Sequence, residues 1–416
     1  MRSVICSIGD GLESTPASFY KNRSTLSLSP HPPNAVLIDP RTDSRALGLY
    51  VHFPWCIKKC PYCDFNSHPL KETTDQDAYL EALLSDWQHQ YELLGQKRLA
   101  ETPSENFTSI FFGGGTPSLF KPEHLHRLMR EIPHRAAEIT LEVNPGSSEY
   151  FRFEDYQAAG INRLSIGAQS FSNTQLAALG RVHQMHETLQ ALERARHAGF
   201  DNINLDLMWG LPGQTVAGAL ADLQQAIDLS PEHISWYQLT IEAKTEFARR
   251  PPLLPKDGFL QDIEAAGLEL LADAGFERYE VSAFAKPNEQ CIHNLTYWSF
   301  GDYLGIGAGA HGKVRVGDHI MRTQRPSQPR LYQQDPTTIA PAPVSTEQRG
   351  LEFMMNALRL IDGVEQAVFE ERTNMPWHDN QAVWGELVAL DLVASDRCAT
   401  TPLGLRYLDS VLERFL

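Results

Sequence analysis

Three cysteines in one short segment carry the strongest chemical signal in this sequence. Cys56, Cys60 and Cys63 lie in HFPWCIKKCPYCDF, separated by four and then three residues. Pro54 and Pro61 flank and interrupt the segment, so we expect a loop rather than a helix with three buried thiols on one face. Such a loop can fold around a compact polynuclear metal centre.

Two metal centres are compatible with this loop. Iron–sulfur clusters usually have four cysteine ligands. Three local cysteines with no obvious fourth leave one iron open to bind a small molecule, as in reactive metal sites that keep a free position. The alternative is a zinc ion with His52 or His68 as the fourth ligand.

Short strands and amphipathic helices alternate after Ala46 and must position the loop. The expected strands are Leu47–Phe53, Ser109–Phe112, Ile139–Val143, Arg163–Ile166, Ile203–Met208 and His233–Leu239. The expected helices are Gln76–Lys97, Pro122–Ile132, Glu149–Ala159, His186–His197, Val216–Leu229 and Leu260–Ala274. Six such alternations predict an α/β fold with a parallel sheet, either open or wound into a barrel.

Unusual polar residues and glycines follow the expected strands. In both geometries reactive groups lie just beyond the C-terminal strand ends. The cysteine loop follows the first strand, and Gly113–Gly115 follow the second. Glu142, Gln169 and Asp206 lie at or near the ends of the third, fourth and fifth strands. Each alone is at least as often structural, but together they predict one site.

Composition disfavours several other classes of protein. The net charge is −16, with 52 acidic and 36 basic residues and no Lys/Arg-rich run, which disfavours nucleic acid as a partner. No stretch approaches the roughly 20 apolar residues of a membrane span. The six cysteines are not spaced as a disulfide framework, so we expect a reducing, cytoplasmic location.

The cysteine spacing resembles the signature of the radical S-adenosylmethionine (SAM) superfamily. The resemblance implies that the open iron chelates the amino and carboxylate groups of SAM and that electron transfer cleaves it to a 5′-deoxyadenosyl radical. Tyr62, directly before Cys63, matches an aromatic position that typically lies near the adenine. The resemblance favours the [4Fe–4S] cluster over zinc.

Further segments narrow the resemblance to the HemN/HemW group of this superfamily. They are LYVHFPWC, YCDFNSH, FFGGGTPSLF, EVNPG, GINRLSIGAQSF, LGRVH, NLDLMWGLPGQT and HISWYQLTIE, and the resemblance covers Leu47 to Leu416. The group implies a partial (β/α)6 barrel with a small, mostly helical, winged-helix-like C-terminal domain. We expect a disordered or loosely attached leader (1–46), the barrel (47–285), a transition region (286–340) and the C-terminal domain (341–416).

The resemblance also implies the SAM contacts. The matching positions are Tyr50, Gly114, Gly115, Thr116, Glu142, Gln169, Arg181 and Asp206, together with Tyr62. The glycine run is similar to the element that binds the methionine amino group. Gln169 and Asp206 are expected to bind ribose hydroxyls, and Arg181 a carboxylate.

Two features distinguish the branches of the group. The oxygen-independent coproporphyrinogen III oxidases carry an additional cysteine where this chain has Phe65, and the haem chaperone branch carries HNxxYW, present here from His293 to Trp298. This branch implies haem bound at His293, with Cys291 as a second candidate ligand, and delivery to acceptor haem proteins that include membrane or respiratory proteins. A homodimer is a further expectation. The alternatives are an oxidase that decarboxylates propionate side chains and, disfavoured by the acidic charge, an RNA-modifying enzyme.

Overall fold

The computed structural model describes residues 39–43, 46–92, 107–132, 134, 136–146 and 150–416. Most of the expected leader and the end of the expected helix 76–97 lie outside these residues. Within the described part of the leader, the Pro40 carbonyl accepts hydrogen bonds from Ser299 and Arg372. Residues 39–43 are therefore attached to the C-terminal part of the chain.

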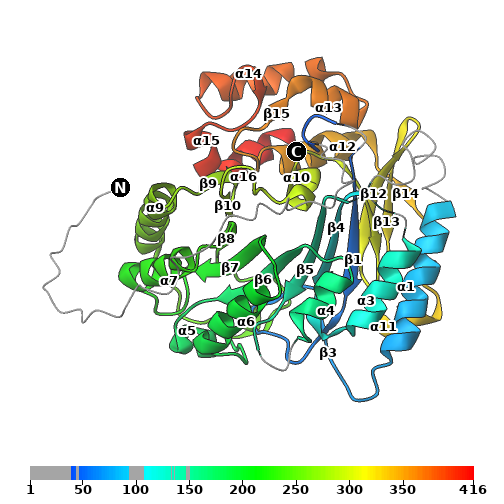
Figure 1. Ribbon diagram of the computed structural model, residues 1–416. Helices are drawn as coiled ribbons and strands as arrows, with labels where there is room; N and C mark the ends of the chain where they lie inside the picture. Colours follow the sequence, from blue (N-terminus) through cyan, green and yellow to red (C-terminus); the bar gives the residue numbers. More distant parts are fainter. Residues whose placement is uncertain (1–38, 44–45, 93–106, 133, 135, 147–149) are drawn as a thin grey trace, which may run out of the picture.

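One curved sheet of twelve strands forms the centre of the molecule (Figure 1). Its middle consists of six parallel strands that confirm the expected ones. They are β1 (Leu47–Phe53), β4 (Phe107–Gly114), β5 (Glu138–Val143), β6 (Arg163–Gln169), β7 (Ile203–Trp209) and β8 (His233–Gln238). The α/β expectation is thus confirmed.

Side chains alternate between the two faces of these strands. In β1, Leu49 and Val51 are fully buried, whereas Tyr50 is only partly buried. Because successive strand residues point to opposite faces, the apolar set packs beneath the helices and the polar set faces the concave side of the sheet. The concave side therefore carries the residues with chemistry.

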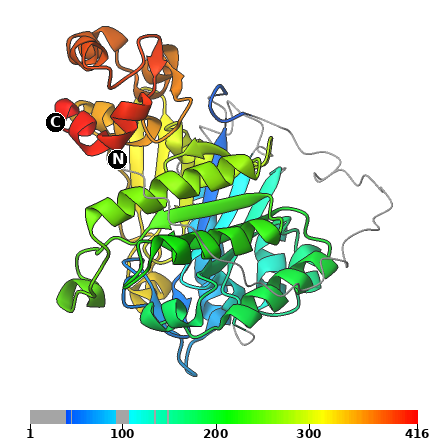
Figure 2. The same ribbon diagram turned by 90° about the vertical axis from the view of Figure 1, so that its left-hand side faces the viewer.

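Helices cover the outer face of the sheet (Figures 1 and 2). The main ones are α1 (Gln76–Gln90), α3 (Pro122–Glu131), α4 (Phe153–Ala158), α6 (Met185–His197), α7 (Val216–Asp228) and α9 (Asp257–Asp273). Short helices α5 (Asn173–Ala178) and α8 (Glu246–Arg249) were not predicted. Side chains cap several N-termini: Asp75 accepts from the Ala78 amide and Thr215 from the Gly218 amide.

The sheet extends at both edges beyond the prediction. Strand β11 (Asp302–Ile306) pairs with β1 in parallel, and antiparallel strands β12 (His311–Val316), β13 (His319–Gln324) and β14 (Ala342–Pro343) follow. Strands β10 (Ala283–Ala285) and β9 (Glu277–Glu280) complete the other edge. The expected Pro/Gln-rich connector contains α11 (Pro329–Gln334), whose Tyr332 hydroxyl donates to Asp86 on α1. Residues 302–343 thus belong to the sheet and to the helices packed on it.

A helical C-terminal region has its own apolar core. It contains α12 (Thr346–Ala357), β15 (Val364–Glu365), α13 (Gln366–Thr373), α14 (Gln381–Ala389), β16 (Arg397–Cys398), α15 (Pro402–Arg406) and α16 (Leu408–Leu412). A series of edge-to-face aromatic contacts joins Phe353, Phe369, Trp377 and Trp384. This region adjoins α10 (Ile292–Trp298), and together they lie at the end of the sheet opposite β3 (His68–Pro69) and the cysteine loop (Figure 1). Among the described helices, none has both the length and the hydrophobicity that crossing a membrane requires.

Candidate functional site

The three cysteines of the loop lie around one cavity. Cys56 belongs to the short strand β2 (Trp55–Cys56), which pairs with β3, and the Cys63 amide donates to the Cys60 carbonyl across a turn. The segment is a loop, as predicted. All three cysteines line a cavity of about 250 Å³ at the C-terminal ends of the parallel strands.

Most of the predicted SAM residues line the same cavity. They are Tyr62, Gly114, Gly115, Thr116, Glu142, Gln169, Arg181 and Asp206. They come from six separate segments of the chain, so the parallel sheet brings them together as the strand-end rule predicts. Tyr50 lies deeper, where its hydroxyl donates to His52 Nδ1 at 2.9 Å, and it is not among the lining residues.

The two histidines of the zinc alternative already have other partners. His52 accepts from Tyr50 and donates from Nε2 to the Asn66 carbonyl at 2.8 Å, while His68 Nε2 lies 3.2 Å from Asn66 Oδ1. In the described ranges, no three His, Cys, Asp or Glu side chains converge closely enough to hold a single ion. The two histidines of the zinc alternative therefore have hydrogen-bond partners of their own in this structure.

Arg181 is held in place beside the cysteines. Its guanidinium lies 3.6 Å from Cys60 Sγ and donates to Asn144 Oδ1 at 2.6 Å and to the Gly167 carbonyl at 3.0 Å. Asn144 in turn donates to Thr116 Oγ1 at 2.8 Å. A fixed guanidinium with a defined orientation suits recognition of a carboxylate.

The glycine run is required by close backbone packing. A Cβ on Gly114, whose φ is +115°, would lie 2.5 Å from the His52 ring, and one on Gly115 would lie 2.6 Å from the Trp55 carbonyl oxygen. The Gly114 amide donates to Glu142 Oε2 at 3.0 Å. Only glycine lets this turn lie against the first strand and orient the carboxylate.

Two carboxylates with perturbed pKa values face the cavity. Burial, with the Asp206 charge adding to it, raises the pKa of Glu142 to about 8. Burial also raises the pKa of Asp206, although hydrogen bonds from Asn204 and Ser165 act in the opposite direction. A bound cation such as an ammonium group would favour the ionised form of both carboxyl groups. The cavity thus combines two carboxyl groups with the guanidinium of Arg181.

Replacing Glu142 by Gln should change how stability depends on pH. The folded state holds a proton on Glu142 that the unfolded chain releases near the ordinary glutamate pKa of 4.5, so the stability of the wild type falls as pH rises from there towards about 8. Each unit of difference between the folded and unfolded pKa changes the free energy of unfolding by about 1.4 kcal/mol. At the upper end of this range, the free energy of unfolding of the ligand-free variant should therefore exceed that of the wild type by at least about 1 kcal/mol.

Urea unfolding near pH 5 and near pH 8 tests this, with the exposed Glu131→Gln variant as the control. Equal pH dependence in Glu142→Gln and wild type would contradict the assignment of a buried, protonated carboxyl.

The sequence analysis did not single out several of the lining residues, among them Asn144, Ser165 and Tyr237. Asn144 directly follows the third strand, in the quoted segment EVNPG, so its place at a strand end was a usable signal. Tyr237 donates to Gln169 Oε1 at 2.7 Å, and Gln169 has a positive φ of 65° where the β6–β7 register shifts. Strained backbone at a non-glycine residue is typical of functional sites.

His293 lies on α10, at the other end of the strands from the cysteines. It is 2% exposed, Nδ1 is hydrogen-bonded to Ser109 Oγ at 2.9 Å, and the ring stacks on Phe111. Burial lowers its pKa to about 3, so the imidazole is neutral. Nε2 has no hydrogen-bond partner among the described residues. A neutral, unpaired imidazole nitrogen fits a metal ligand, but α10 must move to admit one.

Cys291 has a structural environment. Its thiol donates to Glu138 Oε1 at 3.3 Å and is 1% exposed, and burial raises its pKa to about 12. Such a thiol is a poor metal ligand because only the thiolate coordinates strongly. Neither Cys291 nor His293 lines the cavity of the cysteine loop.

Comparisons with known proteins are consistent with this architecture. The family model described as the radical SAM superfamily matches residues 50–226. The chain is 44% identical to "Heme chaperone HemW" of Escherichia coli over 382 residues, covering 89% of this chain and 98% of the relative. HemW of Haemophilus influenzae is also 44% identical, over 378 residues with the same coverage. The fold is similar to coproporphyrinogen III oxidase (HemN) from Escherichia coli, with a TM-score of 0.72 and 23% identity over 89% of this chain and 90% of that one.

Proposed function

Because this chain belongs to the HemW family of the radical SAM superfamily, we propose that it is a haem chaperone that binds haem and passes it to acceptor haem proteins. The identity extends over nearly the whole length of the relatives, so the proposal includes the curved sheet with its helices, α10 and the C-terminal region. Membership of the superfamily implies a [4Fe–4S] cluster and SAM.

The observation that carries the proposal for the cluster is the gathering of three cysteines at one cavity that also holds both carboxylates and Arg181. We assign the cluster to Cys56, Cys60 and Cys63. When bound, the cluster would supply an open iron for the amino and carboxylate groups of SAM and a source of one electron. Tyr62, Gly114, Gly115 and Thr116 would contact SAM from the loop and the glycine turn.

In the proposed complex, the two carboxylates and Arg181 each bind a different part of SAM. Glu142 would attract the ammonium group, and Arg181 would bind the carboxylate. Asp206 and Gln169 would accept or donate hydrogen bonds at the ribose hydroxyls. Tyr50 would act from beneath, by fixing His52 against the glycine turn.

The proposed haem site is α10 with His293 as the axial ligand. Its neutral Nε2 supports this assignment, and two aromatic rings contact the imidazole, Phe111 stacked on it and Tyr297 edge-on. We also propose a cytoplasmic location. A homodimer whose formation depends on the cluster remains an expectation.

The second candidate is an oxygen-independent coproporphyrinogen III oxidase, favoured by the shared fold with HemN. Phe65 argues against it, since it replaces the cysteine of that branch and is 60% exposed at the mouth of the cavity. Anaerobic assay of the reconstituted protein with reductant, SAM and coproporphyrinogen III should give no carbon dioxide above the protein-free control. Haem titration of the same sample should give a saturable Soret band. Robust formation of protoporphyrinogen would replace the chaperone proposal by the oxidase.

A further inference from the structure

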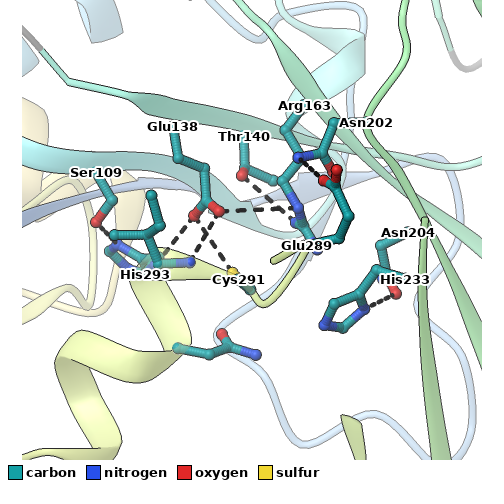
Figure 3. A network of polar contacts seen from close by, with 12 residues as sticks. Ser109, Glu138, Thr140, Arg163, Asn202, Asn204, His233, Glu289, Cys291 and His293 are labelled. Carbon is teal, nitrogen blue, oxygen red and sulfur yellow. Dashed lines mark hydrogen bonds and ion pairs between the residues drawn. The ribbon is translucent and has the colours of Figure 1, made fainter. Parts of the chain in front are cut away.

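A continuous series of hydrogen bonds crosses the inside of the sheet from the SAM cavity to α10. It begins at Asp206, which accepts from Asn204 Nδ2 at 2.8 Å. Asn204 Oδ1 is 2.6 Å from His233 Nδ1, and His233 Nε2 is 2.9 Å from the Tyr279 hydroxyl (Figure 3 shows the His233–Asn204 pair). The Tyr279 oxygen accepts from Asn294 Nδ2, in the HNxxYW segment, at 3.4 Å. We call these five residues the relay.

All donors of the relay point the same way. Asn204 donates to a carboxylate, so its carbonyl oxygen must accept, and His233 must donate from Nδ1. His233 Nε2 then accepts from the Tyr279 hydroxyl, whose oxygen accepts from Asn294. Hydrogen bonds aligned in one direction polarise and strengthen one another in a low-dielectric interior. The series thus ends by directing a donor at one oxygen of Asp206.

The interior of the relay is closed to water. His233 is 1% exposed, Asn204 2% and Tyr279 7%. Burial and the charge of Arg163 lower the pKa of His233 well below 6.5, so the ring stays neutral and keeps one tautomer. Ser165, which accepts from Asn204 and donates to the second oxygen of Asp206, completes the support of the carboxylate.

A second contact ties α10 to the same end of the sheet. Glu138 accepts from the amides of Ile292 and His293 at 2.8 and 3.0 Å and from the Cys291 thiol (Figure 3). Arg163 lies 3.9 Å from Glu138 within the same network. The N-terminus of α10 is therefore held by Glu138, while Asn294 is held through Tyr279. Movement of α10 to expose His293 would disturb both contacts.

We propose that Asn204, His233 and Tyr279 are positioning residues that orient Asp206 for SAM and connect it to α10, so that SAM and haem oppose each other's binding. The inference rests on the proposed role of Asp206 at the SAM ribose. Haem bound at His293 displaces α10, releases Asn294 from Tyr279 and loosens Asp206. Because coupling between two binding sites is reciprocal, SAM bound at Asp206 favours release of haem.

The Tyr279→Phe variant tests the relay because it removes one hydroxyl and little volume. The SAM affinity of the cluster-loaded protein should fall about 3- to 10-fold, the effect of one buried hydrogen bond. Tyr156→Phe is the matched control: its hydroxyl is also buried and donates to the Ser118 carbonyl, off the relay. That control should keep wild-type SAM affinity. Iron content and the thermal midpoint of each variant report on folding separately.

A pair of His233 variants separates positioning from packing. His233→Leu should weaken SAM binding and reduce the SAM-induced change in the electron paramagnetic resonance (EPR) spectrum of the reduced cluster. In His233→Gln, the amide can both donate and accept a hydrogen bond. This variant should therefore recover part of the SAM affinity and part of the SAM-induced change in the EPR spectrum. Equal SAM affinity in wild type and Tyr279→Phe, or no difference between the Leu and Gln variants, would overturn the positioning role.

The link to α10 is measured by titrating SAM with and without saturating haem. In wild type, haem should weaken SAM binding about threefold or more, the effect of losing one hydrogen bond, and in Tyr279→Phe the difference should vanish. Wild type that binds both ligands independently would overturn the link. Wild type that binds no SAM or no haem would instead refute the proposed function, which is a distinguishable result.

Discussion

Replacing Cys60 by Ala is expected to abolish the visible absorbance of the cluster after anaerobic reconstitution and to remove SAM binding with it. Cys60 lines the cavity together with Cys56 and Cys63, and Arg181 holds its guanidinium 3.6 Å from the Cys60 sulfur. Two remaining thiolates leave two irons of a cubane without protein ligands, so the cluster should be lost rather than weakened. The far-ultraviolet circular dichroism should stay at the wild-type level, because the loop contributes little to the main apolar core.

Cys398→Ala is the matched control for this prediction. Cys398 is fully buried in the C-terminal core, far along the chain from the loop and not on the cavity. The control should keep full absorbance and a wild-type content of iron and sulfide, with some loss of thermal stability. A Cys60→Ala protein that retains wild-type iron and absorbance would show that the cluster, if any, lies elsewhere.

Replacing His293 by Leu is expected to weaken haem binding at least about tenfold, which corresponds to about 1.4 kcal/mol. Leucine keeps the apolar packing against Phe111 but removes Nε2, the nitrogen without a hydrogen-bond partner among the described residues. The Soret band of the variant should also shift, since loss of an axial nitrogen ligand changes the coordination of the iron. Titration followed by absorbance measures both effects.

Two controls accompany the haem titration. His124→Leu removes another buried histidine, on α3, and should bind haem like wild type. Cys291→Ala tests the second candidate ligand and should also bind normally, because its protonated thiol is occupied by Glu138. An unchanged Soret band and affinity in both His293→Leu and Cys291→Ala would exclude this segment from the haem site.

The central strands were predictable because their signals are local. Short runs rich in β-forming residues identified β1 and the five strands that follow in the parallel part of the sheet, several to within a residue. Strand β11 was missed because the run GDYLGIGAGAHG reads as a turn-rich segment, although Leu304 and Ile306 are buried between strands. The pairing of β11 with β1 joins segments about 250 residues apart, which no local pattern reports.

The site was predictable to a similar depth. Residues at or near the ends of strands, such as Glu142 and Asp206, could be placed on one rim from the geometry of parallel sheets alone. The relay could not be predicted from the sequence. Asn204, His233 and Tyr279 have the pattern of ordinary strand residues, and their contact depends on how β7, β8 and β9 lie beside one another in the folded sheet. The position of His293 at the opposite end of the strands likewise follows from the return of the chain through β10 to α10.

The most direct test of the account is an anaerobic count of iron and sulfide in the reconstituted wild-type protein, with EPR spectra recorded before and after addition of SAM. The account predicts about four irons and four sulfides per chain and a spectrum that SAM alters through the open iron. Stoichiometric zinc, with no spectrum and no iron or sulfide incorporated after reconstitution, would contradict it.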